Sequence, residues 1–478
     1  MTDPRPLGPP VPGWTARARP PHEIIEGRFA RLEPLDPQRH GADLFTAFTA
    51  DPSGAAWTYR LEEPVADKAA FDGWLAAIST KDDMIYFAYV DAATGRAAGN
   101  GAFMSIAEGA GAIEIGSIMI APPLARSRAG TEALVLMIRW AFEAGYRRLE
   151  WTCDPLNKAS MAAAERLGFT YEALFRAAYV TKGRNRDKAI FAIIDEDWPA
   201  LDAAYRTWLS DDNFDAAGAQ RARLRDLTAA HAHAIAPPAR SDRLNALGQE
   251  IGPAVDGWTP PPQPPRTPHE GRYVRLEPLD PARHAEALFA ANGGDAAMFD
   301  YLFEAPFADA GAYRDWTEDA ATREDQHFHA IVDLADGAAK GVASYLRIAP
   351  AAGSIEVGNI AYSPALQRTR AGTEAMYLFM KRAFELGYRR YEWKCNHLNA
   401  PSRRLALRLG MSFEGVFRQA IIVKGRNRDT SWYAVTRDEW PALQAAFETW
   451  LDPSNFDADG RQKTSLTKLT RPLLSRIG

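Results

Sequence analysis

The chain repeats itself at a distance of about 244 residues. Arg31 to Pro37 reads RLEPLDP and recurs unchanged from Arg275 to Pro281. Lys182 to Asp187 reads KGRNRD and recurs unchanged from Lys424 to Asp429, a separation of 242 residues. Solenoids repeat every ~20 to 50 residues, so a period this long indicates instead a duplicated domain of roughly 200 residues.

The repeat divides the chain into two domains. We expect residues 1–215 to form the first domain and residues 252–457 to form the second, each opening with a proline-rich arm. Such arms favour an extended polyproline II conformation over helix. Residues 216–251 are expected to be a linker, and residues 458–478 a loose tail.

Composition excludes several classes of protein. Hydrophobic residues make up 46% of the chain and charged residues 24%, which is typical of globular domains. A net charge of −5 offers no basic face for nucleic acid, and no apolar run reaches the roughly 18 residues that cross a bilayer. The two cysteines, Cys153 and Cys395, exclude a disulfide framework and a cysteine-rich zinc site. We therefore expect a cytoplasmic protein with no metal, nucleic-acid or membrane partner.

Hydrophobic periodicity predicts the same order of elements in both copies. In the first copy, alternation predicts strands at 29–35, 84–90, 97–106, 112–120, 148–153, 171–181 and 189–194. Apolar residues at helical spacing predict helices after Asp36-Pro37, at 67–79, 131–145 and 157–167, and after Asp197. This order indicates an α/β fold: two tandem domains, each a mixed, mostly antiparallel sheet flanked by helices.

One stretch of the second copy resembles a known family. Ile355-Glu356-Val357-Gly358 is followed by Gln367-Arg368-Thr369-Arg370-Ala371-Gly372-Thr373-Glu374-Ala375 and then by Asn399-Ala400-Pro401-Ser402-Arg403-Arg404. The pattern resembles the GNAT superfamily of N-acetyltransferases, specifically the branch with the ribosomal-protein N-terminal acetyltransferases. The family's acyl-CoA motif is Gln/Arg, two residues, Gly, one residue, Gly/Ala. Both copies depart from it, because arginine (Arg128, Arg370) replaces the first glycine, and the first copy also has Ala125 at the leading position.

The resemblance implies an acetyl-CoA site at the start of a helix in each copy. Backbone N–H groups and the helix dipole at such a turn attract a pyrophosphate, and a guanidinium adds a charge-assisted contact. A plain solvated helix start is the alternative. The implied cofactor-binding residues are Gln367, Arg368, Arg370, Ala371, Gly372, Thr373, Asn399 and Arg403 in the second copy, and Arg126, Arg128, Ala129, Gly130, Thr131 and Asn157 in the first.

Four residues are candidates for catalysis. Acyl transfer to an amine needs a base, and the resemblance places it at Glu114 and Glu356, on the strand before the acyl-CoA turn. An outward-facing strand carboxylate is the alternative. In the family, the hydroxyl matching Ser160 and Ser402 serves the departing thiolate, whereas Asn and Ser at helix starts are also common caps. Cys153 and Cys395 are expected to be buried structural thiols.

The rim of the acceptor side is predicted at the repeated turn. Lys182 to Asp187 and Lys424 to Asp429 form a charged hairpin turn, which is either an acceptor-side rim or an ordinary solvated turn. Arg176 and Arg418 precede the turn on a strand and are expected to face the cleft.

Together, these features predict an N-acyltransferase that moves an acetyl group from acetyl-CoA to a primary amine, either a protein N-terminus or a small molecule. The alternative is an acyl-CoA-binding regulatory or structural protein in which one or both domains are catalytically silent. We expect the second copy to be the more competent, because it keeps Gln367 and adds Arg403 and Arg404. The two copies are also expected to pack as a pseudo-dimer.

Overall fold

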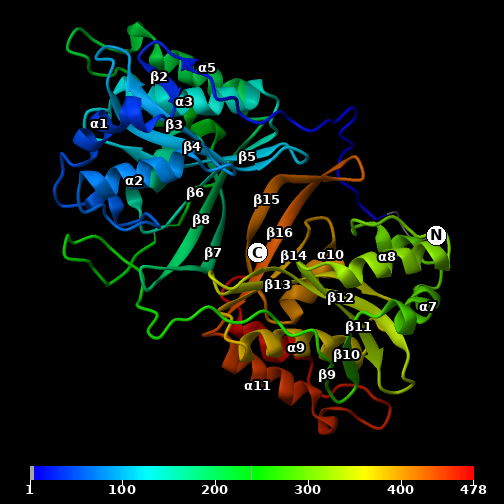
Figure 1. Ribbon diagram of the computed structural model, residues 1–478. Coiled ribbons are helices and arrows are strands. Elements are labelled where there is room, and N and C mark those ends of the chain that lie inside the picture. Colours follow the sequence, from blue (N-terminus) through cyan, green and yellow to red (C-terminus); the bar gives the residue numbers. More distant parts are fainter. Residues whose placement is uncertain (1–4, 238) are drawn as a thin grey trace.

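The computed structural model describes residues 5–237 and 239–478 as two similar α/β units that meet along one continuous sheet (Figure 1). In the first repeat the strands are β1 (Ile25–Glu26), β2 (Ala30–Pro34), β3 (Ile85–Asp91), β4 (Ala97–Ala107), β5 (Ala112–Ile120), β6 (Arg148–Cys153), β7 (Thr170–Thr181) and β8 (Arg184–Ile194). Its helices are α1 (Pro37–Phe48), α2 (Lys68–Ser79), α3 (Arg128–Glu143), α4 (Lys158–Arg166), α5 (Trp198–Leu209) and α6 (Leu224–Thr228).

The second repeat has the same elements in the same order. Its strands are β9 (His269–Glu270), β10 (Val274–Pro278), β11 (Gln326–Asp333), β12 (Ala339–Ala349), β13 (Ser354–Tyr362), β14 (Arg390–Asn396), β15 (Ser412–Val423) and β16 (Arg426–Thr436). Its helices are α7 (Pro281–Asn292), α8 (Ala310–Thr322), α9 (Arg370–Glu385), α10 (Ala400–Arg408), α11 (Trp440–Leu451) and α12 (Leu466–Thr470). The predicted fold class is confirmed. None of the described helices is long and apolar enough to cross a membrane.

The repeated RLEPLDP segment builds the first strand-to-helix corner of each unit. Asp36 caps α1 by accepting a hydrogen bond from the Gln38 backbone N–H, and a proline occupies the first turn, where its missing N–H has no cost. The buried Glu33 carboxylate lies 3.1 Å from Nε2 of His40, whose Nδ1 accepts from the Asp36 N–H. The second repeat forms the same contacts. The motif therefore recurs because it is a complete local structure.

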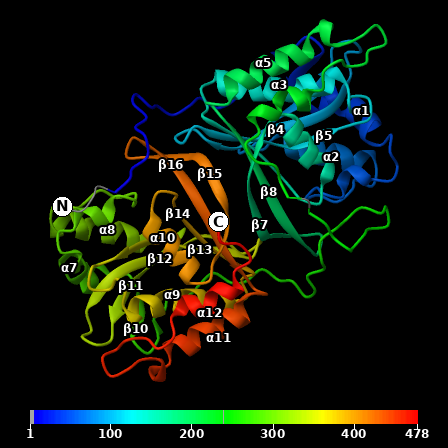
Figure 2. The same cartoon turned by 180° about the vertical axis from the view of Figure 1, so that it is seen from behind.

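One sheet of 16 strands runs through both units. Its order is β1-β2-β3-β4-β5-β6-β8-β7-β15-β16-β14-β13-β12-β11-β10-β9, so β7 and β15 join the halves (Figure 2). In the first repeat α3 and α5 cover one face of the sheet and α1 and α2 the other (Figure 1). At the junction Gly415 pairs with Ala173, and a Cβ on Gly415 would lie only 2.0 Å from the Glu172 carbonyl oxygen. The close approach of the two strands requires glycine there.

Two fully buried arginines bind the halves together. Arg148 contacts Glu172 of its own repeat at 2.7 Å and donates to the backbone oxygen of Arg418 in the other repeat at 2.7 Å. Arg390 makes the matching contacts with Glu414, at 2.6 Å, and with the Arg176 backbone oxygen. Burial alone would lower the pKa of both guanidiniums, but the neighbouring carboxylates raise it, so both stay charged. The structure is thus a pseudo-dimer within one chain.

The contact between the two repeats around β7 and β15, here called the seam, corrects the expectation for Arg176 and Arg418. Arg176 and Arg418 do not face the clefts, because each crosses the seam to a carboxylate of the other repeat. Arg418 lies 2.9 Å from Glu172, and Arg176 lies 3.5 Å from Glu414. Phe175 and Phe417 stack between them with ring centroids 5.7 Å apart.

Removing one carboxylate from the seam tests its importance. Glu414→Gln leaves Arg390 buried with reduced compensation, so the free energy of unfolding should fall by about 3 kcal/mol. Chemical denaturation followed by tryptophan fluorescence measures the change. The matched control is Glu108→Gln, which removes an exposed pair with Arg19 and should cost less than about 0.5 kcal/mol. Equal effects of the two substitutions would show that the seam is not a stabilising contact.

Candidate functional site

In each repeat two neighbouring parallel strands separate halfway along their length. β5 and β6 pair only as far as Glu114 and Glu150, and β13 and β14 only as far as Val357 and Trp393. Beyond these points each strand continues without its partner, which leaves a V-shaped opening in the sheet. Glu114 and Glu356 therefore lie at the vertex of the opening, and both carboxylates are buried.

In the second repeat this opening is part of a large cleft. Its volume is about 1120 Å³. The lining includes the loop before α9, Glu356 at the vertex, and the start of α10, which brings the predicted acyl-CoA residues and the predicted base to one cavity. The predicted residues that line it are Glu356, Gln367, Arg368, Gly372, Thr373, Asn399 and Ser402.

A tight turn leads into α3 and α9. The Thr369 hydroxyl accepts a hydrogen bond from the Gly372 N–H at 2.9 Å, and Ser127 accepts from Gly130 in the same way. A Cβ on Gly372 would lie 2.6 Å from the Leu366 carbonyl oxygen. Glycine therefore allows the preceding loop to lie directly on the helix start. Ala129 and Ala371 are buried beside it, whereas Arg126 and Arg368 are exposed on the loop with positive φ angles.

The side chains of two predicted phosphate ligands pack on aromatic rings away from the loop. The guanidinium of Arg128 packs between Phe29 and Phe214, 4.1 and 4.0 Å from the ring centroids, and donates to the backbone oxygen of Leu209. Arg370 packs on Tyr273 and Phe456 at 5.0 and 4.5 Å. These arginines replace the family's first glycine because their side chains leave the loop and stabilise the helix start from behind.

A different arginine reaches the helix start. Arg408, on α10, lines the cleft and donates to the Thr373 hydroxyl at 3.1 Å, and Arg166 donates to Thr131 at 3.2 Å in the first repeat. Burial lowers the pKa of both guanidiniums, and neither forms an ion pair among the described residues. A half-buried cation that forms no ion pair with a described residue, beside a helix N-terminus, fits an anionic group such as a pyrophosphate.

Sequence reasoning missed this pair, although a signal was present. Each arginine belongs to an Arg-Leu-Gly triplet, at 166–168 and 408–410, that recurs at the common offset of 242. Repetition of a charged residue inside an otherwise apolar helix face marks it as a candidate for a shared site.

At the start of the helix after each opening, an asparagine caps the helix and a serine hydroxyl is held in a fixed position. These are the capping role and the hydroxyl role considered from the sequence. Asn399 caps α10 by accepting from the Ser402 N–H at 3.2 Å, and Asn157 caps α4 in the same way. The Ser402 hydroxyl accepts a hydrogen bond from the Trp393 indole N–H at 3.1 Å, as Ser160 does from Trp151 at 3.0 Å. The indole fixes each hydroxyl oxygen, so the hydroxyl proton remains to be donated.

Arg403 does not have its predicted position. It donates to the His397 backbone oxygen at 3.3 Å and is absent from the cleft lining, whereas the exposed Arg404 lines the cleft. Helical geometry explains the difference, because consecutive residues project about 100° apart. Arg404 therefore takes the position predicted for Arg403.

The two candidate bases have different partners. Glu114 accepts hydrogen bonds from the hydroxyls of Ser105 at 2.9 Å and Thr152 at 2.6 Å. Burial lowers the pKa of Lys188 on β8 and the nearby Glu114 charge raises it, but no described residue forms a direct ion pair with Glu114. Glu356 instead lies 2.7 Å from Nε of Arg347 and 2.7 Å from Nζ of Lys394.

Charge therefore separates the two sites. Two cations hold the Glu356 carboxylate, whereas two hydroxyl donors hold that of Glu114. Hydroxyl donors stabilise a carboxylate less. The side chains that make this difference belong to neighbouring strands outside the motif, so the motifs alone do not reveal it.

Hollows lie beside the repeated hairpin turns. One of about 520 Å³ is lined by Trp57, Tyr59, Asp154 and Lys182, and the corresponding one of about 430 Å³ is lined by Tyr301, Asn396 and Lys424. The turns therefore border cavities rather than open solvent.

Comparisons with known proteins establish the family. A model of the acetyltransferase (GNAT) domain matches the chain twice, over residues 30–170 and 274–412. These matches cover more than half of the chain, so the chain belongs to the GNAT acetyltransferase family and carries its domain in tandem. The resemblance inferred from the motifs is confirmed.

Solved structures of single GNAT domains are also similar. A GCN5-related N-acetyltransferase from Brucella melitensis shares 48% identity over 45% of this chain and 98% of its own, with a TM-score of 0.44. An acetyl transferase from Salmonella typhimurium, described as modifying the N-terminal serine of the 50S ribosomal subunit protein L7/L12, shares 20% identity over 35% of this chain and 96% of its own, with a TM-score of 0.31. No curated protein matches the chain.

The thiols provide a first test of the site's architecture. Burial raises the pKa of Cys153 to about 12 and of Cys395 to about 11, so almost no thiolate exists at pH 8. Labelling with iodoacetamide at pH 8 should be at least about 100-fold slower in the native protein than in denaturant. Rapid native labelling of either cysteine would place a reactive thiol in the cleft.

The reassigned arginines provide a second test. Arg408→Met removes a charge-assisted contact worth about 1.5 to 3 kcal/mol and should weaken acetyl-CoA binding at the second site by about tenfold or more. Isothermal titration calorimetry of the full chain measures it. Arg370→Met is the matched control and should change affinity less than about twofold. Weaker binding in Arg370→Met alone would restore the phosphate role predicted from the motif.

Proposed function

We propose that the chain transfers an acetyl group from acetyl-CoA to a primary amine, with an acetyl-CoA cleft in each repeat. The observation that carries the proposal is the opening between parallel strands. It begins at a buried glutamate and leads to a helix start with a half-buried arginine that forms no ion pair in the described part of the chain. The acceptor is a protein N-terminus or a small molecule.

Residues around the turn and the following helix hold the donor. The helix start of α9, Gly372 and Arg408 would bind the pyrophosphate, and the start of α10 lies along the cleft where the pantetheine arm enters. Gln367 lines the same cleft and donates to the Tyr362 backbone oxygen at 2.9 Å. The first repeat has Ala125 in its place, so its loop lacks this brace.

Three groups act on the reacting atoms. Glu114 accepts the proton of the attacking amine, which must be neutral to add to a carbonyl. Next to it on β5, Ser117 has a φ of 49° and falls in a bulge outside the pairing with β4, so backbone N–H groups there are available to an oxyanion. The Ser160 hydroxyl, oriented by the Trp151 indole, donates its proton to the departing thiolate.

The alternative function applies best to the second repeat. The ion pairs of Glu356 with Arg347 and Lys394 leave a cleft suited to binding acetyl-CoA but poor in base catalysis. In that case the second repeat is an acyl-CoA-binding regulatory or structural domain, and the first repeat is responsible for turnover.

Matched substitutions separate these functions. Glu114→Gln should reduce turnover by at least about 100-fold, because a general base contributes about 10² to 10⁴. Glu356→Gln should reduce it less than about threefold. The assay follows release of the CoA thiol with a panel of peptide N-termini and small primary amines, and calorimetry checks that both variants still bind acetyl-CoA.

Two results would contradict this account. Loss of turnover in Glu356→Gln with activity kept in Glu114→Gln would assign catalysis to the second repeat. Full activity in both variants would show that neither glutamate is the base.

A further inference from the structure

Each repeat extends a segment of chain onto the other repeat. Residues 8–11 run along the β15–β16 turn, where the Val11 N–H donates to the Gly425 oxygen at 2.8 Å and the Asn427 N–H donates to the Pro9 oxygen at 2.9 Å. In Figure 1 this arm is the dark blue trace that leaves the first repeat and ends near α8 of the second.

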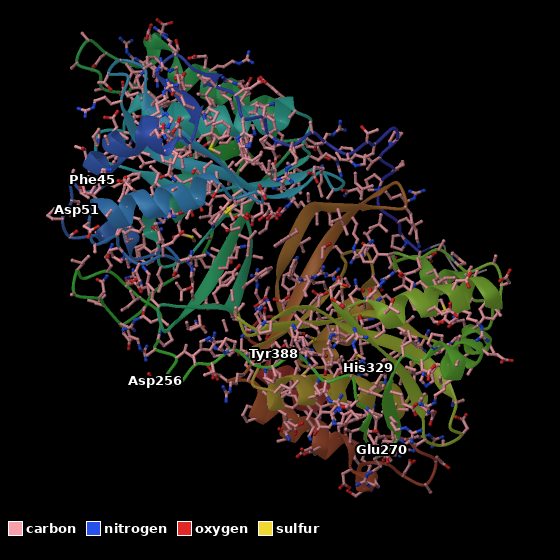
Figure 3. All side chains as sticks on the ribbon, viewed as in Figure 1. Phe45, Asp51, Asp256, Glu270, His329 and Tyr388 are labelled. Carbon is pink, nitrogen blue, oxygen red and sulfur yellow. The ribbon has the colours of Figure 1, made fainter. Side chains whose placement is uncertain are left out.

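The segment before the second repeat does the same in the opposite direction. The Val255 N–H donates to the Gly183 oxygen at 2.8 Å, and the Asn185 N–H donates to the Pro253 oxygen at 2.8 Å. Figure 3 labels Asp256 on this stretch of chain, where it passes from the first repeat to the second. Gly8 and Gly252 occupy equivalent positions, since a Cβ on either would lie 1.9 Å from a carbonyl oxygen of the other repeat's turn. Both arms therefore cross to the other repeat through the same backbone contacts.

The residues before each crossing lie over the hollows. Tyr59 donates its hydroxyl proton to the Glu250 backbone oxygen at 2.9 Å, and Tyr301 donates to the Pro6 oxygen at 2.9 Å. Lys158, on α4, lies 2.8 Å from the Glu250 carboxylate. Residues 241–252, which the sequence suggested to be mainly linker, are thus fixed against the first repeat.

These hollows lie next to the proposed chemistry. In the second repeat Arg5 and Tyr301 line the same cleft as Glu356. In the first repeat Asp154 lines the hollow and lies two positions beyond Thr152, which donates to Glu114 at 2.6 Å. Asp154 directly follows the last residue of β6, so the hollow lies at the end of the strand whose Thr152 contacts Glu114.

We infer that residues 241–252 form the wall that selects the acceptor of the first repeat, and that residues 5–8 do so for the second. This inference rests on the proposed function. Leu244, Leu247 and Ile251 give the first wall an apolar face opposite Trp57, above the buried Asp154 carboxyl. The first repeat therefore accepts a primary amine that carries an alkyl or aryl group.

The second repeat selects differently. Its wall contains Leu7 and Arg5, and Arg5 lies 3.8 Å from Asp300. At the position equivalent to the acidic Asp154, the second repeat has Asn396. Asn396 offers no carboxylate to an ammonium group, and the Asp300 carboxylate of this hollow already has Arg5 as a partner, so the same amine is not favoured there.

Kinetics with phenethylamine as the acceptor tests the first wall. Leu244 and Leu247 are 58% and 45% exposed, so the double variant Leu244→Ser/Leu247→Ser should remain folded. We expect its KM for phenethylamine to rise about tenfold while its KM for acetyl-CoA stays within twofold. The matched control is Ile235→Ser, an equally exposed apolar residue of the same inter-repeat segment that does not line the hollow. An unchanged KM in the double variant, or an equal rise in the control, would overturn the inference.

A labelling experiment tests whether residues 241–252 cover the first hollow, and it does not depend on enzyme activity. Thr181 and Val423 are equivalent positions that line the two hollows. In Thr181→Cys, fluorescein maleimide should react at least fivefold faster after Leu244→Ser/Leu247→Ser, whereas Val423→Cys should not change. Wild-type protein that acetylates no amine would refute the proposed function alone, and equal labelling rates in Thr181→Cys would refute the wall.

Discussion

The arrangement of the two repeats depends on the buried arginine pairs at their seam. Arg148 and Arg390 each satisfy a carboxylate of their own repeat and a backbone oxygen of the other. Separating the repeats would break these bonds to backbone oxygens and the ion pairs of Arg418 with Glu172 and of Arg176 with Glu414, so these contacts hold the repeats in one relative position. The crossing arms depend on this relative position of the repeats, because each arm reaches the other repeat's hairpin turn only in this orientation.

Duplication within one chain has allowed the two sites to differ. Glu114 and Glu356 occupy the same place at the vertex, yet hydroxyls contact one directly, with Lys188 nearby, whereas Arg347 and Lys394 form direct ion pairs with the other. In a symmetric homodimer both sites would carry the same neighbours. In the tandem chain, by contrast, the charges around the two equivalent glutamates differ.

The sequence predicted most of the fold, because each element carried its own signal. The strands at 112–120 and 148–153 have the predicted bounds, since turn residues bracket apolar runs. Motif residues such as Gly372, Asn399 and Ser402 were found together because helix-start chemistry is local.

Features that depend on distant neighbours could not be predicted. Side-chain direction decided between Arg403 and Arg404, and packing against Phe456 removed Arg370 from the loop. The seam joins residues separated by more than 200 positions, such as Arg389 and Asn185, and the crossing arms also join distant residues, such as Val255 and Gly183. No periodicity in one sequence reports such contacts.

Titration of the full chain with acetyl-CoA by calorimetry tests the central claim most directly. Each repeat has its own helix start with an unpaired arginine, so the account predicts two sites per chain. A stoichiometry of one would show that a repeat has lost its donor site, and no binding would contradict an acetyl-CoA cleft in either repeat.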